Sequence, residues 1–178
     1  MTQILIAMML LSALAAAEPA TAPTTTPSTQ PSPVVAIFRE PGYPPPGVTP
    51  HWDLSIGIWD DGTVVYASAK EDAPYHSAKV DPARIDKLIA DLDAAGLFDD
   101  AEVNRQPYRV PVDAGATVLA VEWKGKRQRL GHWRELPDDR FGQVWKASEK
   151  LIRELRPDGG EPVQEIDKRI FRIGWKKK

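Results

Sequence analysis

The sequence predicts an α+β fold, in which an antiparallel sheet of four to six strands carries two helices packed on one face. Two observations predict this class. Short segments with alternating apolar and polar residues flank an Asp-Gly pair, which is typical of a β-hairpin. Two longer segments repeat apolar residues at the spacing of an amphipathic helix. Hairpins and helices alternate along the chain, and the expected order is therefore ββαββα.

The first half of the domain begins with a strand and a hairpin. Residues 34–39 (VVAIFR) form a short apolar run that suits a strand. Apolar residues then alternate with polar ones over 52–58, which predicts a half-buried strand. The pair Asp61-Gly62 predicts a tight turn, and residues 64–67 predict the returning strand.

The first predicted helix follows this hairpin. Asp81 is a typical N-cap residue, Pro82 suits the first helical position, and Gly96 suits the position just after a helix end. We therefore expect a helix with one apolar face against the core. That face consists of Ile85, Leu88, Ile89 and Leu92.

The second half repeats the pattern. Segments 116–123 and 127–133 predict a second hairpin around Lys124-Gly125-Lys126. A second amphipathic helix starts near Pro137 and ends before Pro157. The tail over 163–175 alternates apolar residues, which predicts either a last strand or an extension docked on the domain.

The N-terminal residues predict export. Residues 4–17 are an apolar run whose helical length of ~21 Å is short of the ~30 Å hydrocarbon core of a bilayer. The three alanines that end this run suit the cleavage motif of a signal peptide. We therefore expect a periplasmic or secreted protein without a transmembrane span. Its predicted parts are a signal peptide over 1–17 that is cleaved near Ala17, a Pro/Thr-rich linker over 18–33 and a single domain over 34–178.

Composition excludes several classes of chemistry. The chain has no cysteine, which excludes disulfides, thiol nucleophiles and thiolate metal sites. Its net charge of −2 gives no bulk attraction for nucleic acid. Residues 1–104 carry 5 Lys/Arg and 14 Asp/Glu, whereas residues 105–178 carry 18 and 11. We expect these two sets of charges to face each other or to intermix on the surface.

The turn and helix-end motifs of the chain resemble those of a group of exported proteins. The motif DGTVVY at 61–66, the helix DPARIDKLIADLDAAGLFD at 81–99 and a strand–Gly-Lys–strand pattern at 117–130 are similar to small bacterial exported domains of unknown function. The resemblance covers about residues 50–133. It supports the predicted fold only, and it names no functional residue.

The histidines are the main candidates for catalytic chemistry. His51, His76 and His132 suit zinc or copper, or a small hydrolase if one of them pairs with a carboxylate. Their spacing matches no metal-binding motif, and no serine lies in a nucleophile-elbow sequence. The sequence therefore predicts no catalytic residue, no metal ligand and no cofactor. A small hydrolase or a metal-dependent enzyme stays an alternative.

Aromatic and basic residues near strand ends are the candidates for partner binding. Tryptophan offers a large apolar face and one donor, which suits stacking on sugars or packing against proline-rich peptide. The basic hairpin tip suits contact with cell-wall polyanions, and the protection of a sheet edge by charge is its alternative explanation. The candidates are Tyr43, Trp52, Trp59, Trp123, Trp133, Lys124, Lys126, Arg127 and Arg129.

These observations predict an exported, non-enzymatic binding module of the bacterial cell envelope. The expected partner is an envelope protein or a glycan, and no nucleic acid is expected. An inhibitor of a periplasmic enzyme is a further alternative, for which the rigid proline-rich loop over 41–50 is the candidate insertion element. The sequence does not indicate an oligomeric state.

Overall fold

The computed structural model describes most of the predicted domain. The described residues are 30–42, 46–47, 49, 51–68, 74–99, 103 and 115–174. The predicted signal peptide, the start of the linker and Tyr43 lie outside these ranges. Within them, no helix combines the length and the apolar composition that a bilayer crossing requires.

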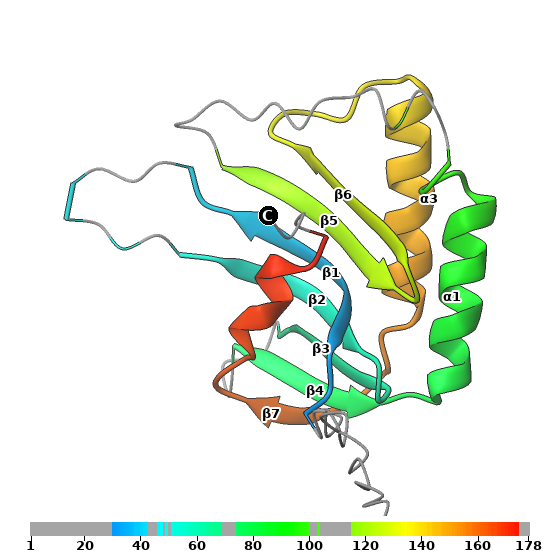
Figure 1. Ribbon diagram of the computed structural model, residues 1–178. Helices are drawn as coiled ribbons and strands as arrows, with labels where there is room; N and C mark the ends of the chain where they lie inside the picture. The colour runs from blue at the N-terminus through cyan, green and yellow to red at the C-terminus, as the bar shows by residue number, and fades with distance from the viewer. Residues whose placement is uncertain are drawn as a thin grey trace, which may run out of the picture.

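The core of the structure is one antiparallel sheet of seven strands, in the spatial order β6-β5-β1-β2-β3-β4-β7 (Figure 1). Every neighbouring pair in this order is antiparallel. The strands are β1 (Pro33–Glu40), β2 (Asp53–Trp59), β3 (Thr63–Ala67), β4 (Tyr75–Lys79), β5 (Ala116–Trp123), β6 (Lys126–His132) and β7 (Glu161–Val163).

The α+β class, the antiparallel sheet and the two helices are confirmed, whereas the expected number of strands and the order ββαββα are wrong. The observed order is four strands, a helix, two strands, a helix and a short strand. Strand β4 (YHSAK) was missed because its polar residues hide the alternation of a strand. Strand β7 was missed because it has three residues and contains Pro162, which is tolerated at a sheet edge.

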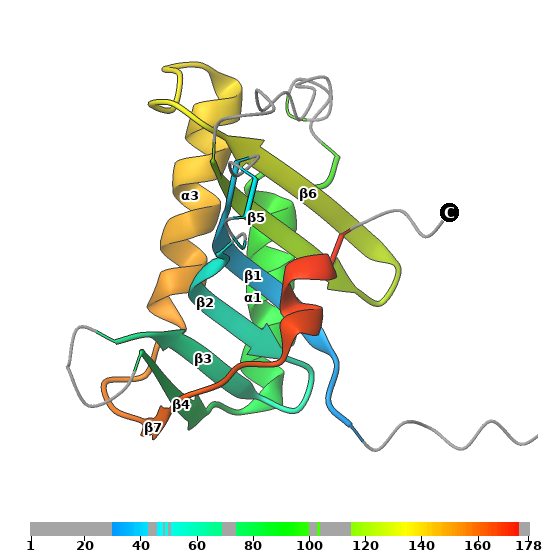
Figure 2. The ribbon, with the colours of Figure 1, turned by 90° about the vertical axis from the view of Figure 1, so that its left-hand side faces the viewer.

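Helices α1 (Pro82–Ala94) and α3 (Arg140–Glu154) cover one face of the sheet, here called the helix face (Figure 2). Each begins at an aspartate whose carboxylate accepts a backbone N–H, Asp81 from Ala83 and Asp139 from Gly142. The predicted end of the first helix is confirmed, since Gly96 follows it with a φ of 93°.

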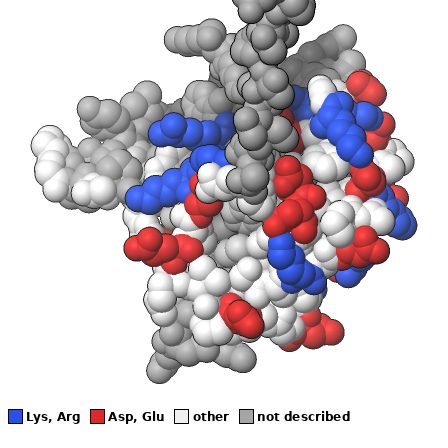
Figure 3. Space-filling model, turned by 60° about the horizontal axis from the view of Figure 1, so that its bottom comes forward, with Lys and Arg blue, Asp and Glu red and all other residues white. Residues whose placement is uncertain are grey.

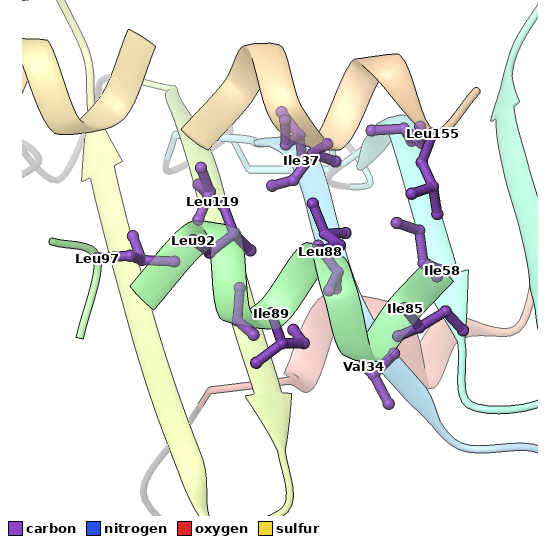
Figure 4. Packing of buried hydrophobic residues seen from close by; sticks show 14 of the residues in the cluster. Val34, Ile37, Ile58, Ile85, Leu88, Ile89, Leu92, Leu97, Leu119 and Leu155 are labelled. Atoms are coloured by element: carbon purple, nitrogen blue, oxygen red, sulfur yellow. The ribbon is translucent and has the colours of Figure 1, made fainter. Parts of the chain in front are cut away.

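The core under the helices is a continuous apolar cluster between helix and strand side chains. In Figure 4, Leu88 and Leu92 of α1 point toward Ile37 of β1 and Leu119 of β5. All four are at most 3% exposed. Burial of this apolar area is the main stabilising contribution to the fold.

The opposite face of the sheet is covered in part by the chain end. A 3-10 helix, η1 (Lys168–Arg172), crosses this face, here called the η1 face, and it is the red coil in Figure 1. It joins a second apolar cluster with residues of β1, β2 and β5. Because these central strands are buried on both faces, β1 and β5 show near-continuous apolar runs.

A bulge in β2 divides its apolar residues between the two faces. The β1–β2 register shifts between two neighbouring residues of β1: Ile37 pairs with Ile56, and Phe38 pairs with Leu54. Leu54 therefore joins the cluster on the η1 face, whereas Ile56 joins the cluster under the helices. The expected half-buried strand is in fact buried on both sides over most of its length.

Candidate functional site

A groove with a volume of about 930 Å³ opens on the η1 face. Strands β2 and β4 both begin at this end of the sheet, because each is antiparallel to β3. The C-terminal segment, defined as residues 164–174, forms the other wall. The lining residues are His51, Trp52, Tyr75, Gln164, Glu165, Ile166, Lys168, Phe171 and Arg172.

Trp52 and Phe171 form the aromatic floor of the groove, and the fully buried ring of Phe38 packs against both. The ring centroid of Trp52 lies 5.8 Å from that of Phe38 and 5.3 Å from that of Phe171, and the two phenylalanine rings are 5.2 Å apart. The rings are tilted or edge-to-face, as aromatic pairs prefer. Trp52 is half-buried, so part of its ring is open to the groove.

The rim of the groove is charged. Lys168 and Arg172 are exposed, and neither forms an ion pair with any described residue. His51 Nε2 lies 3.3 Å from Asp53 Oδ1. Glu165 is the one acidic residue in the lining. Besides His51, the lining therefore carries two positive charges and one negative charge.

The start of the C-terminal wall is fixed by Asp167 and Arg169. The Asp167 carboxylate accepts the backbone N–H of Arg169 at 2.9 Å and the Nε–H at 2.7 Å. The Arg169 side chain also lowers the pKa of Asp167, against the opposing effect of burial, and Trp59 donates a further hydrogen bond. Arg169 in turn donates to the backbone oxygen of Pro31 at 2.7 Å.

The other end of the wall is held by Arg129 of β6. Its guanidinium donates to the backbone oxygens of Phe171 at 3.3 Å and Ile173 at 3.1 Å. It also lies 5.1 Å from the ring centroid of Phe38 and pairs with Glu40. The side chain is only 9% exposed, so Arg129 acts as a clamp between the sheet and the C-terminal segment.

The predicted aromatic candidates have different positions. Trp52 lines the groove, and Trp59 is buried beneath η1 with 5% exposure. Trp123 donates its Nε1–H to Asp86 of α1 at 2.9 Å. Trp133 is 39% exposed at the far end of β6, where the Arg134 guanidinium lies 3.9 Å from its ring centroid. Tyr43 lies outside the described residues.

The predicted basic candidates are paired within the domain. Each of the four hairpin cations contacts a carboxylate: Lys124 pairs with Asp86, Lys126 with Asp93, Arg127 with Glu122 and Arg129 with Glu40. Three of these pairs join residues 1–104 to residues 105–178. The expectation that the two sets of charges face each other or intermix is confirmed, and Figure 3 shows both signs interspersed on the face it presents.

The three histidines do not converge. His51 lies at the groove. Between ring centroids, His76 of β4 lies 6.1 Å from Tyr66, and His132 of β6 lies 4.6 Å from Trp145. Strands β4 and β6 are five steps apart in the sheet, about 24 Å at the usual strand spacing. The part of the chain that the structure describes holds no group of three or more metal-binding side chains.

Sequence reasoning missed the residues of the C-terminal wall. The alternating apolar pattern of the tail predicted either a last strand or a docked extension, and Ile170 and Phe171 pack against the sheet as part of a docked extension. Nothing in that pattern indicated that Lys168 and Arg172 would meet Trp52 in one groove. The rim cations Lys168 and Arg172, rather than the paired hairpin cations, are therefore the basic residues of the site.

A scan against models of known protein families finds no match, and a search among curated proteins finds none either. The resemblance to small exported domains of unknown function stays a prediction. The interpretation of the groove depends on its own geometry and charge.

Proposed function

We propose that this chain is an exported, non-enzymatic binding module of the bacterial cell envelope that holds its ligand in the groove of the η1 face. The observation that carries the proposal is an aromatic floor next to two cations that have no ion-pair partner among the described residues, all in one concave site. A volume of about 930 Å³ is within the usual range for ligand pockets.

The composition of the groove supports binding. Trp52, Tyr75 and Phe171 supply apolar area that water solvates poorly, and a ligand that covers it gains free energy from the hydrophobic effect. Tryptophan, tyrosine and arginine are also the residue types that contribute most to binding energy at interfaces. Export is supported by the apolar run and the alanines of residues 4–17, which lie outside the described part.

The walls of the groove are held in place before any ligand binds. Arg129 clamps one end of the C-terminal segment, and the Asp167–Arg169 pair fixes the other. A preformed site loses less conformational entropy on binding than a mobile one. This arrangement suits recognition of a ligand by a rigid surface.

The test of binding uses the indole N–H signals of the full chain in NMR spectra. Oligosaccharides of N-acetylglucosamine and a mixture of short peptides serve as probes. We expect at least one probe to shift the Trp52 signal, with the exposed Trp133 as the internal control. If probes shift only Trp133, or if neither class shifts Trp52, the groove is not the binding site.

The test of export is separate. The full chain is produced in a bacterium with a C-terminal tag, and its cellular fraction and N-terminal residue are determined. We expect it in the periplasm or the medium, with Glu18 as the new first residue. An uncleaved chain in the cytoplasm would overturn the exported location.

A further inference from the structure

We infer that the ligand of the groove is an acidic peptide segment, in which carboxylates contact Lys168 and Arg172 and a neighbouring apolar side chain contacts Trp52. This inference rests on the proposed function, because it names the ligand class of the same site. The partner is therefore expected to be a protein that presents such a segment.

The first argument is charge complementarity. The hairpin cations of β5 and β6 are neutralised by carboxylates of the same domain. Lys168 and Arg172, in contrast, have no acidic partner among the described residues, and both line the groove. They lie four residues apart on η1. A ligand that places negative groups beside both of them forms charge-assisted hydrogen bonds without breaking an existing pair.

The second argument is the arrangement of the rings. Sugars stack on broad, open ring faces, whereas here Trp52 and Phe171 are tilted by 39° and Phe171 is only 8% exposed. The two rings and the half-buried Ile166 form a concave apolar seat instead. Such a seat suits one aliphatic or aromatic side chain better than the flat face of a sugar ring.

The rim cations and part of the apolar surface belong to the same short element, η1. Phe171 lies between Lys168 and Arg172 in the sequence of η1, and all three side chains line the groove. A ligand that contacts all three side chains therefore carries negative groups close to an apolar group. Acidic residues that flank a leucine or phenylalanine in a peptide meet this requirement directly.

The test is a selection from a random peptide library displayed on phage, with the full chain as bait. We expect the selected peptides to be enriched in Asp and Glu next to an aromatic or aliphatic residue. Lys168→Glu and Arg172→Glu should each lower the affinity of a selected peptide at least tenfold. Lys146→Glu is the matched control, because Lys146 is an exposed cation of α3 on the other face of the sheet.

The outcomes separate this inference from the proposed function. Selection of neutral or basic peptides, or no enrichment at all, overturns the acidic-peptide inference. If an N-acetylglucosamine oligosaccharide binds instead and Trp52→Ala abolishes its binding, the groove remains the binding site and only the ligand class is wrong. If selected acidic peptides bind equally well to Lys168→Glu, Arg172→Glu and Lys146→Glu, the groove is excluded as their site.

Discussion

Ile170 of η1 lies directly over Gly57 of β2, so that a Cβ atom on Gly57 would lie only 3.1 Å from two carbons of the Ile170 side chain. Gly57 pairs with Ala36 of β1, and Ala36 pairs with Ala120 of β5, so small residues form a row across the η1 face. This row lets η1 approach the sheet closely. Since η1 supplies one wall of the groove, the Gly57–Ile170 contact also sets the shape of the candidate site.

A larger side chain at Gly57 should therefore push η1 away from the sheet. We expect Gly57→Val to lower the free energy of unfolding by about 1–3 kcal/mol, the usual cost of overpacking. Urea unfolding followed by fluorescence measures the change. Gly159→Val is the control, because a Cβ atom there meets nothing within 4 Å, and its effect should stay below about 0.5 kcal/mol. Equal effects of the two substitutions would show that the close contact is unimportant.

Ile170→Ala tests the same contact from the other side. The Ile170 side chain is fully buried, so its truncation alone should cost about 2–4 kcal/mol. In the double variant Gly57→Val/Ile170→Ala, the new valine occupies space that the isoleucine has left. We expect the double variant to be more stable than the sum of the single effects by about 0.5–2 kcal/mol. Strict additivity, measured by the same urea titrations, would contradict direct packing between the two positions.

Local signals account for the parts of the fold that the sequence predicts. The Asp61-Gly62 turn and the helix starts at Asp81 and Asp139 depend on residues within a few positions of each other. The division of Leu54 and Ile56 between the two faces of the sheet depends on a more distant part of the chain, because the bulge that separates them forms by pairing with β1. The sequence therefore predicts that β2 is a strand, but it does not predict that this strand is buried on both faces.

The candidate site was predictable only in part for a similar reason. Trp52 was expected to bind a partner because of its type and its place at a strand end. The groove, however, forms only when the C-terminal segment docks beside Tyr75 and Trp52, which are about 90 and 110 residues away in sequence. The cations of the hairpin were likewise named without their partners, and their carboxylates lie in other elements of the fold.

The Asp167 carboxylate should make the stability of the domain depend on pH. Its hydrogen bond from Arg169 lowers its folded-state pKa below the ordinary value of 3.8, although burial opposes this shift. A lowered folded-state pKa stabilises the folded protein at pH values above the unfolded pKa, and this contribution is lost as the pH falls below about 4. We therefore expect the urea midpoint to fall with decreasing pH in this range, and to fall less steeply in Asp167→Asn.

The control for this pH dependence is Asp158→Asn. Asp158 is exposed and forms no ion pair in the described ranges of the chain. Its substitution should leave the slope of the urea midpoint against pH unchanged between about pH 5 and pH 3. If Asp158→Asn and Asp167→Asn reduce the slope equally, the Asp167–Arg169 pair is not the cause.

Arg129 should hold the C-terminal segment against the sheet. Arg129→Met keeps the apolar stem of the side chain but removes the donors to Phe171 and Ile173, and we expect a loss of about 1–3 kcal/mol in unfolding free energy. Hydrogen–deuterium exchange should become faster over residues 164–174 and stay unchanged in α1. Arg153→Met is the control, because Arg153 is an exposed residue of α3, on the other face of the sheet, and pairs with Glu149 at 2.7 Å. Unchanged exchange over residues 164–174 in Arg129→Met, or equally faster exchange there in Arg153→Met, would contradict the role of Arg129 as a clamp.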